Sequence, residues 1–386
     1  MTAEILLPSI LKIGPGAFAE TAPMLARLGC RRCLLVTDPF LVSRGLPQQL
    51  RQQLLNASIS CEIFAETVPD PTTTVVTAGL NAFRADQCDS LISLGGGSPI
   101  DTAKAIGMLS ANPGECRDYK VPNAIPNPGP PHLAIPTTAG TGSEVTRFAV
   151  ITDTNTDEKM LLAGAFLLPT AAIVDFELTL TMPARLTADT GTDSLTHAIE
   201  AYVSRRANLF TDGIALSAMR TIWDFLPTAF HSPGDRDARE AMMLAATMAG
   251  IAFSNASVAL VHGMSRPIGA HFHVPHGLSN AMLLPAVTAF SASAAPERYA
   301  ACARAMGIAA TSDSTQRAVE KLVAALWARN AELEVPSPRR YGIAHDRYHA
   351  LIPTMAAQAL ASGSPQNNPR VPTTEEICEL YRQVYD

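Results

Sequence analysis

The chain has 386 residues, of which 47% are hydrophobic and 17% charged, and its formal net charge is −6. This length favours two domains of ordinary size, and this composition excludes a disordered chain. Lysine and arginine form no cluster, so nucleic acid is not an expected partner. The N-terminal residues lack the pattern of a signal peptide, and no apolar run approaches bilayer length. We therefore expect a soluble, cytoplasmic protein without a membrane partner.

Seven cysteines are scattered along the chain, an odd number without the spacing of a disulfide framework. Cys30 and Cys33 form a C-x-x-C pair, which in a redox protein would open a helix after a strand. Here the pair precedes an apolar, strand-like run. We interpret both cysteines as packing residues.

Up to residue 182, strand-like and helix-like segments alternate. Short apolar runs that end in turn residues predict strands at 32–37, 59–65, 90–94, 132–136 and 171–175. Segments with the apolar period of a helix predict helices at 47–56, 73–85 and 99–109. The proline-rich segment 122–131 predicts an extended loop. Such alternation is typical of a parallel sheet covered by helices.

The pattern changes after Pro183, where strand signals nearly vanish. Long apolar-periodic stretches predict helices at 188–204, 210–225, 235–254, 296–305, 314–330 and 374–385. We therefore predict an α/β domain over residues 1–182 and an all-helical domain over residues 183–386.

The motif GGGSP at 95–99 follows a predicted strand and opens a predicted helix. Glycines let backbone N–H groups approach a phosphate closely, and a helix N-terminus adds partial positive charge. The motif favours a phosphate-binding loop, although it is not the GxGxxG fingerprint. The alternative is a tight turn in which Ser98 caps the helix.

Two further features follow strands of the same domain. The motif PTTAGTGSE at 136–144 is rich in small and hydroxyl residues, which suits either a ligand-binding loop or a structural turn. Asp38 follows the strand 32–37 and precedes Pro39. Its carboxylate would bind a ribose 2′-hydroxyl and repel a 2′-phosphate, unless it is simply a turn aspartate.

Asp193 and His197 lie four residues apart in a predicted helix, which places both side chains on one face. Six of the nine histidines fall between residues 197 and 276. The later histidines that compete for further ligand places are His262, His271, His273 and His276. One carboxylate and several imidazoles suit a borderline divalent ion such as Fe(II) or Zn(II).

Taken together, these residues resemble the iron-containing (group III) alcohol dehydrogenases, the family of the lactaldehyde and propanediol oxidoreductases. The resemblance covers nearly the whole chain, from Ile13-Gly14 to Asn368-Pro369-Arg370. Its most specific motifs are GGGSPIDTAKAIG at 95–107, PTTAGTGSEVT at 136–146, TGTDSLTHAIEAYVS at 190–204 and HGMSRPIGAHFHVPHGLSNAMLLP at 262–285. Four long motifs in the family's order make a chance match very improbable.

The resemblance implies a dehydroquinate synthase-like architecture, in which a dinucleotide-binding α/β domain precedes a helical domain and the active site lies in the cleft between them. The implied activity is that of an oxidoreductase: reversible hydride transfer between a small primary alcohol or aldehyde and NAD(H). One divalent ion acts as a Lewis acid, with Fe(II) the preferred ion and Zn(II) the alternative. A homo-oligomer is usual in this family.

The family's functional positions carry over residue by residue. The implied metal ligands are Asp193, His197, His262 and His276. The implied cofactor contacts are Asp38, Gly96, Gly97, Ser98, Thr138, Thr141, Lys159 and Leu178.

The chain departs from the family at two positions. Many members have a histidine four residues after the third ligand, where this chain has Arg266, which stays protonated and cannot act as a base. His271 is then a candidate proton relay, with the cofactor ribose as the alternative. Phe148 stands where some relatives have a polar asparagine, and together with Phe253 it predicts an apolar substrate wall and a substrate less polar than a diol.

Other reactions use the same scaffold. A hydroxyacid–oxoacid transhydrogenase that holds NAD tightly is the nearest alternative, followed by glycerol dehydrogenase and dehydroquinate synthase. A synthase would need a basic pocket for a phosphorylated acid, and the sequence has no such cluster. A non-catalytic metal-binding protein would have lost the nucleotide loop or a ligand, and both are present.

Overall fold

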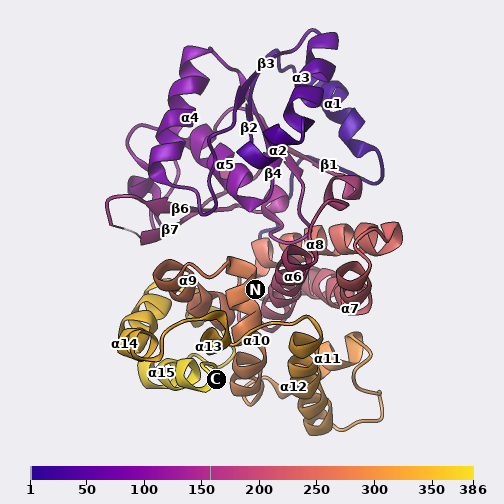
Figure 1. The fold of residues 1–386 in the computed structure, drawn as a ribbon, viewed down its shortest axis with the longest axis vertical. Coiled ribbons are helices and arrows are strands. Elements are labelled where there is room, and N and C mark those ends of the chain that lie inside the picture. The colour runs from indigo at the N-terminus through magenta and orange to yellow at the C-terminus, as the bar shows by residue number, and fades with distance from the viewer. Residues whose placement is uncertain (1, 157) are drawn as a thin grey trace. The chain divides into compact units, whose positions relative to one another are not determined.

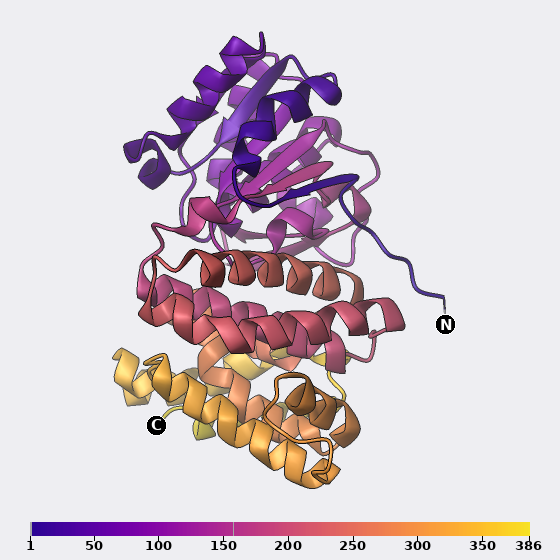
Figure 2. The same cartoon turned by 90° about the vertical axis from the view of Figure 1, so that its right-hand side faces the viewer.

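The computed structural model describes residues 2–156 and 158–386 (Figures 1 and 2). The chain divides into two compact units. One unit comprises Ile5–Thr181, and the other comprises Met182–Asp386 with the residues that precede Ile5. We call them the α/β unit and the helical unit.

The α/β unit contains a six-stranded parallel sheet with the strand order β1-β8-β5-β4-β2-β3. Its strands are β1 Ile10–Ile13, β2 Arg32–Val36, β3 Ser60–Phe64, β4 Ser90–Gly95, β5 His132–Pro136 and β8 Ala171–Val174. Its helices are α1 Thr21–Arg27, α2 Pro39–Ser43, α3 Leu46–Asn56, α4 Thr73–Ala85 and α5 Gly97–Ala111. The five strands and three helices predicted from the sequence are all confirmed.

Helices cover both faces of this sheet (Figure 1). Because successive side chains of a strand point to opposite faces, β2 contributes to two cores. Leu34 and Val36 join the apolar cluster that contains residues of α4 and α5. Cys33 and Leu35 join the cluster that contains residues of α1 and α3. Burial on both faces explains why these strands are continuous apolar runs.

Several features of this unit differ from the prediction, and the short helices α1 and α2 were not predicted. An antiparallel hairpin, β6 Phe148–Asp153 and β7 Glu158–Ala163, was not predicted, because its burial alternates along each strand whereas its sequence does not alternate apolar with polar residues. The edge strand β1 was not predicted, because it is only partly buried and Lys12 interrupts its apolar run. Helix α5 begins at Gly97 with Gly96 as its N-cap, so the alternative in which Ser98 caps this helix is wrong.

The helical unit contains no strand within its described residues. Its helices are α6 Ala184–Val203, α7 Leu209–His231, α8 Arg236–Ala256, α9 Leu260–Phe272, α10 His276–Ala292, α11 Pro296–Ala305, α12 Thr315–Glu332, α13 Pro338–Tyr341, α14 His345–Ala361 and α15 Thr374–Gln383. The six predicted helices are confirmed. The extents of helices α9, α10 and α14 were not predicted, because each contains an internal proline and α10 is apolar on nearly all sides. The short helix α13 was also not predicted.

Helix α6 is the centre of this unit. Its residues from Thr187 to Val203 are almost all buried, because α7, α8 and α10 pack around it. Polar side chains on α6 are therefore shielded from water, and each needs a hydrogen-bond or ionic partner within the protein.

Among the described residues, no single helix is both long and apolar enough to cross a membrane. Helices α8 and α9 pass that test only as a pair, and the pair is bent by 105°.

The proline-rich segment packs closely on α5, and this contact gives a test of the fold. A Cβ on Gly129 would lie 2.6 Å from the backbone oxygen of Gly107, which cannot move aside. We predict that Gly129→Ala destabilises the protein by about 1–3 kcal/mol. The control is Gly213→Ala on α7, where nothing lies within 4 Å and helix propensity predicts a gain of about 0.5–1 kcal/mol. Urea denaturation measures both, and equal stabilities of the two variants would contradict the close packing.

Candidate metal centre and nucleotide loops

Three helices of the helical unit bring four potential metal ligands together. Asp193 and His197 lie one turn apart on α6, His262 lies in the first turn of α9, and His276 begins α10. One ligand atom from each of the four lies within 4.8 Å of all the others. Among the described residues this is the one such cluster of three or more His, Cys, Asp or Glu side chains.

The spacing of these atoms suits a single ion. Asp193 Oδ1 lies 3.4 Å from His262 Nε2 and 3.8 Å from the Nε2 atoms of His197 and His276. Four ligand atoms at the corners of a tetrahedron, each about 2.1 Å from its centre, are separated by about 3.4 Å. A carboxylate with three imidazoles is also a donor set for Fe(II) or Zn(II). The residues present therefore fit one divalent ion.

Three of the four potential ligand side chains are shielded from solvent, and the fourth is accessible. The side chains of Asp193, His197 and His262 are 3–5% exposed, whereas that of His276 is 41% exposed. Such asymmetry is expected of a catalytic site, which needs an accessible position beside the ion.

The charges of Asp193 and the neighbouring histidines stabilise one another. Burial acts to raise the pKa of Asp193, but the neighbouring imidazoles of His197, His276 and His262 outweigh it and hold that pKa well below its usual range. Burial acts to lower the pKa of His262, but hydrogen bonds and charges from Asp193 and Glu200 raise it to about 9. Binding of an ion therefore displaces a proton from this cluster.

Glu200 fixes the orientation of His262. One carboxylate oxygen accepts hydrogen bonds from the Ala259 N–H (2.9 Å) and His262 Nδ1 (2.6 Å), and the other accepts from the Val261 N–H (2.6 Å). Because a carboxylate only accepts, His262 donates from Nδ1 to Glu200, which leaves Nε2, 3.4 Å from Asp193 Oδ1, as its ligand atom. Glu200 was not predicted as a site residue, although its position three residues after His197 on a buried helix was a usable signal of a role beside the ligands.

Asn280 also lies against the ligand atoms and was missed. It follows His276 by one turn of α10 and is fully buried. Its amide nitrogen donates to Asp193 Oδ1 at 2.6 Å and lies 3.2 Å and 3.3 Å from the Nε2 atoms of His262 and His276. Asn280 therefore fixes Asp193 and packs against two further ligand atoms, although its two amide hydrogens can serve at most two of these three contacts.

The two predicted substrate-wall residues belong to different units. Phe253 on α8 stacks on His197 with ring centroids 4.1 Å apart, and the same imidazole stacks on His262 at 4.6 Å. Phe253 thus shields one ligand from water. Phe148 begins β6 and is half-buried, and Lys104 Nζ donates to its carbonyl oxygen at 2.7 Å.

The competing histidines lie outside the cluster. His271 Nε2 pairs with Gln358 Oε1 of α14 at 2.9 Å. His273 is exposed and ends α9 with a positive φ of 55°. Arg266 donates from Nη1 to Ser364 Oγ at 3.0 Å.

In the α/β unit the two predicted nucleotide loops contact each other at the carboxyl ends of β4 and β5. A Cβ on Gly96 would lie 3.3 Å from Thr138 Oγ1, and one on Gly97 would lie 3.0 Å from Thr141 Cγ2. A side chain at residue 96 or 97 would therefore fit only if the threonine side chains of the second loop moved aside. Asp38 caps α2 by accepting from the Leu41 N–H at 2.9 Å.

A buried polar network ties the second loop to α5. Lys104 donates to Ser143 Oγ at 2.9 Å and Thr146 Oγ1 at 3.1 Å, and Ser143 Oγ donates to Asp101 Oδ1 at 2.5 Å. Burial lowers the pKa of Lys104 to about 8 despite the nearby Asp101. The sequence did not single out this network, which fixes the loop that carries Thr138 and Thr141.

The remaining predicted cofactor residues have other partners or remain accessible. Lys159 on β7 forms an ion pair with Asp70 at 2.8 Å. Leu178 is partly buried against the core of the sheet. Ser98 is half-buried in the first turn of α5.

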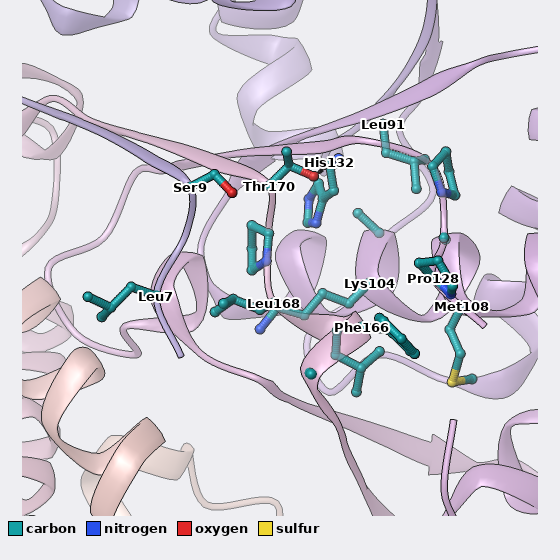
Figure 3. A pocket seen from close by; sticks show the side chains of 17 residues that line it. Leu7, Ser9, Leu91, Lys104, Met108, Pro128, His132, Phe166, Leu168 and Thr170 are labelled. Atoms are coloured by element: carbon teal, nitrogen blue, oxygen red, sulfur yellow. Dashed lines mark hydrogen bonds between the residues drawn. The ribbon is translucent and has the colours of Figure 1, made fainter. Parts of the chain in front are cut away.

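A separate cavity of about 250 Å³ lies at the amino ends of β4 and β5, the sheet edge opposite to the nucleotide loops (Figure 3). His132 and Lys104 line it. His132 Nε2 is bonded to Ser93 Oγ at 2.8 Å, and burial lowers the pKa of His132 to about 3. Since His132 and Lys104 are both hydrogen-bonded within the protein, we assign no ligand to this cavity.

Comparisons with known proteins agree with the two-part arrangement. Residues 8–176 match the family model described as "Iron-containing alcohol dehydrogenase", and residues 187–385 match "Fe-containing alcohol dehydrogenase family, C-terminal". The chain is 40% identical over 382 residues to the NAD-dependent methanol dehydrogenase of Bacillus methanolicus, covering 99% of each. It is 38% identical over 388 residues to the lactaldehyde reductase of Escherichia coli K12, covering both completely. A crystal structure of 1,3-propanediol oxidoreductase matches the whole chain with a TM-score of 0.96 and 38% identity.

The position of Glu200 predicts a measurable effect on metal affinity. Glu200→Gln removes the charge that sets the tautomer of His262, and loss of such a partner typically weakens metal binding by about 10–100-fold. Competition with a chelator of known affinity measures this change. The control is Glu240→Gln, an exposed glutamate on α8, which should bind metal as the wild type does. Equal metal affinity of both variants would show that Glu200 has no role in the centre.

Proposed function

Because the chain belongs to the iron-containing alcohol dehydrogenase family, we propose that it catalyses reversible hydride transfer between a small primary alcohol and NAD(H). The observation that carries this proposal is the cluster of Asp193, His197, His262 and His276. The relatives that match the full chain are named for methanol and lactaldehyde as substrates, and the methanol enzyme is named as NAD-dependent.

We propose that the four clustered residues hold one divalent ion, with Fe(II) preferred and Zn(II) as the alternative. Bound there, the ion supplies Lewis-acid chemistry, which favours loss of a proton from an alcohol and polarises an aldehyde in the reverse direction. The carboxylate of Asp193 supplies the negative charge of the donor set. Glu200 and Asn280 keep the ligand atoms in place.

The nucleotide loops are the proposed site for NAD(H), which provides the hydride acceptor. Backbone N–H groups of the loop at Gly96 and Gly97 open α5, where partial positive charge favours a pyrophosphate. Thr138 and Thr141 add hydroxyl groups beside this loop. Lys159 and Leu178 are further proposed contacts, and binding of the cofactor beside Lys159 would compete with its ion pair to Asp70.

The proposed substrate is small and less polar than a diol. Phe253 covers one face of His197 and excludes water from that side of the cluster, and Phe148 is the second proposed apolar contact. His271 is bonded to Gln358, and the proposal does not depend on it as a proton relay. We also propose that the protein acts as a cytoplasmic homo-oligomer, as is usual in the family.

Metal removal and reconstitution test this function directly. Chelated protein should not reduce NAD with small primary alcohols, and added Fe(II) or Zn(II) should restore the reaction. His262→Ala should lower kcat/KM by at least about 100-fold, because it removes a ligand and also the hydrogen bond that His262 Nδ1 donates to the buried carboxylate of Glu200. Absorbance of NADH measures the rate across a panel of alcohols.

The contrary outcome would be an inactive wild type that still binds one ion and NADH. That result would favour the transhydrogenase alternative, which is recognised by a nucleotide that does not exchange with free NAD. An unchanged rate in His262→Ala would contradict the metal site itself.

Cofactor choice gives a separate prediction. The carboxylate of Asp38 caps α2 with one oxygen and is positioned at the end of β2, where it would repel a 2′-phosphate. Asp38→Ser keeps a capping oxygen and removes the charge, so the ratio of kcat/KM for NADP to that for NAD should rise at least about tenfold. Steady-state kinetics with both cofactors measure the ratio. No change in the ratio would exclude Asp38 from the cofactor site.

A further inference from the structure

The first turn of α14 presents two histidines on one face of the helix. His345 and His349 lie four residues apart, and their rings stack with centroids 4.0 Å apart and planes inclined by 28°. The side chain of His345 is 65% exposed, and His349 is half-buried. Neither residue belongs to the cluster formed by Asp193 and its partners.

The hydrogen bonds of both rings set the same tautomer. His349 Nδ1 lies 3.0 Å from the carbonyl oxygen of His345, and His345 Nδ1 lies 3.0 Å from Asp346 Oδ1. A carbonyl and a carboxylate can only accept, so each neutral ring carries its proton on Nδ1. Each ring therefore has its Nε2 lone pair available, which is the arrangement found in histidines that bind metal ions.

Tyr385 limits the movement of both rings. Its ring meets His345 edge-on at 5.4 Å and His349 edge-on at 5.0 Å. The hydroxyl of Tyr385 is itself fixed by donating to the Ile343 carbonyl at 3.0 Å. The two imidazoles are thus held close together before any ligand binds, which reduces the entropy lost on binding.

We propose that His345 and His349 form a second site for a divalent transition metal, independent of the proposed catalytic centre. Two imidazole nitrogens one helical turn apart suit Cu(II), Ni(II) or Zn(II), with Cu(II) bound most tightly. Solvent completes the coordination because His345 is exposed. A bound ion also clamps the first turn of α14, whose N-cap Ala344 makes no side-chain capping bond.

Copper titration of the whole chain tests this site. Wild-type protein should bind one more Cu(II) than His345→Gln/His349→Gln, and the electron paramagnetic resonance spectrum of that extra ion should show coupling to imidazole nitrogen. Asp346→Asn should weaken binding of the extra ion by about tenfold, because it weakens the hydrogen bond that orients His345. The matched control is His231→Gln, which removes an exposed histidine on α7 and should keep the wild-type stoichiometry.

The difference between wild type and double variant separates this site from the catalytic one. Copper that the double variant still binds is attributed to the cluster around Asp193. If that cluster binds no copper, the wild type should still bind one ion more than the double variant. Alcohol oxidation by the double variant, loaded with one equivalent of Fe(II), should match the wild type. Equal copper stoichiometry in wild type and double variant, with both folded by circular dichroism, would overturn the proposal.

Discussion

A carboxylate buried beside three imidazoles is the constraint on which the helical unit depends. Asp193 lies on the most buried helix, where an isolated charge would be too costly to keep. The imidazoles of His197, His262 and His276 and the amide of Asn280 provide its compensation. Helices α9 and α10 must therefore converge on α6 at Asp193, and a divalent ion held there would add positive charge beside the carboxylate.

Glycines next to the ligands allow this convergence. A Cβ on Gly277, beside His276, would lie 2.3 Å from the backbone oxygen of Asp189, so α10 can begin against α6 only if this residue is glycine. A Cβ on Gly263, beside His262, would lie 2.8 Å from the ring of Pro365. The ligands are thus positioned by backbone packing as well as by their own hydrogen bonds, which favours a centre that is formed before the ion binds.

The sequence predicted those parts of the molecule whose signals are local. The strand at 132–136 and the helix at 73–85 have the predicted bounds, because apolar runs and periodicity arise from burial that each element experiences on its own. The extent of helix α10 was not predicted, because this helix is apolar on nearly all sides and its sequence has no clear apolar period. For the site, the i,i+4 spacing of Asp193 and His197 was readable, whereas the choice among the later histidines required the family resemblance. Asn280 acts through a contact between distant segments, which spacing alone does not reveal.

X-ray absorption by the protein loaded with one equivalent of Fe(II) or Zn(II) tests the central claim most directly. The account predicts three imidazole nitrogens and one carboxylate oxygen at about 2.0–2.2 Å from the ion, with one imidazole lost in His262→Ala. Sulfur neighbours, or a spectrum that His262→Ala leaves unchanged, would contradict a metal centre built from these four residues.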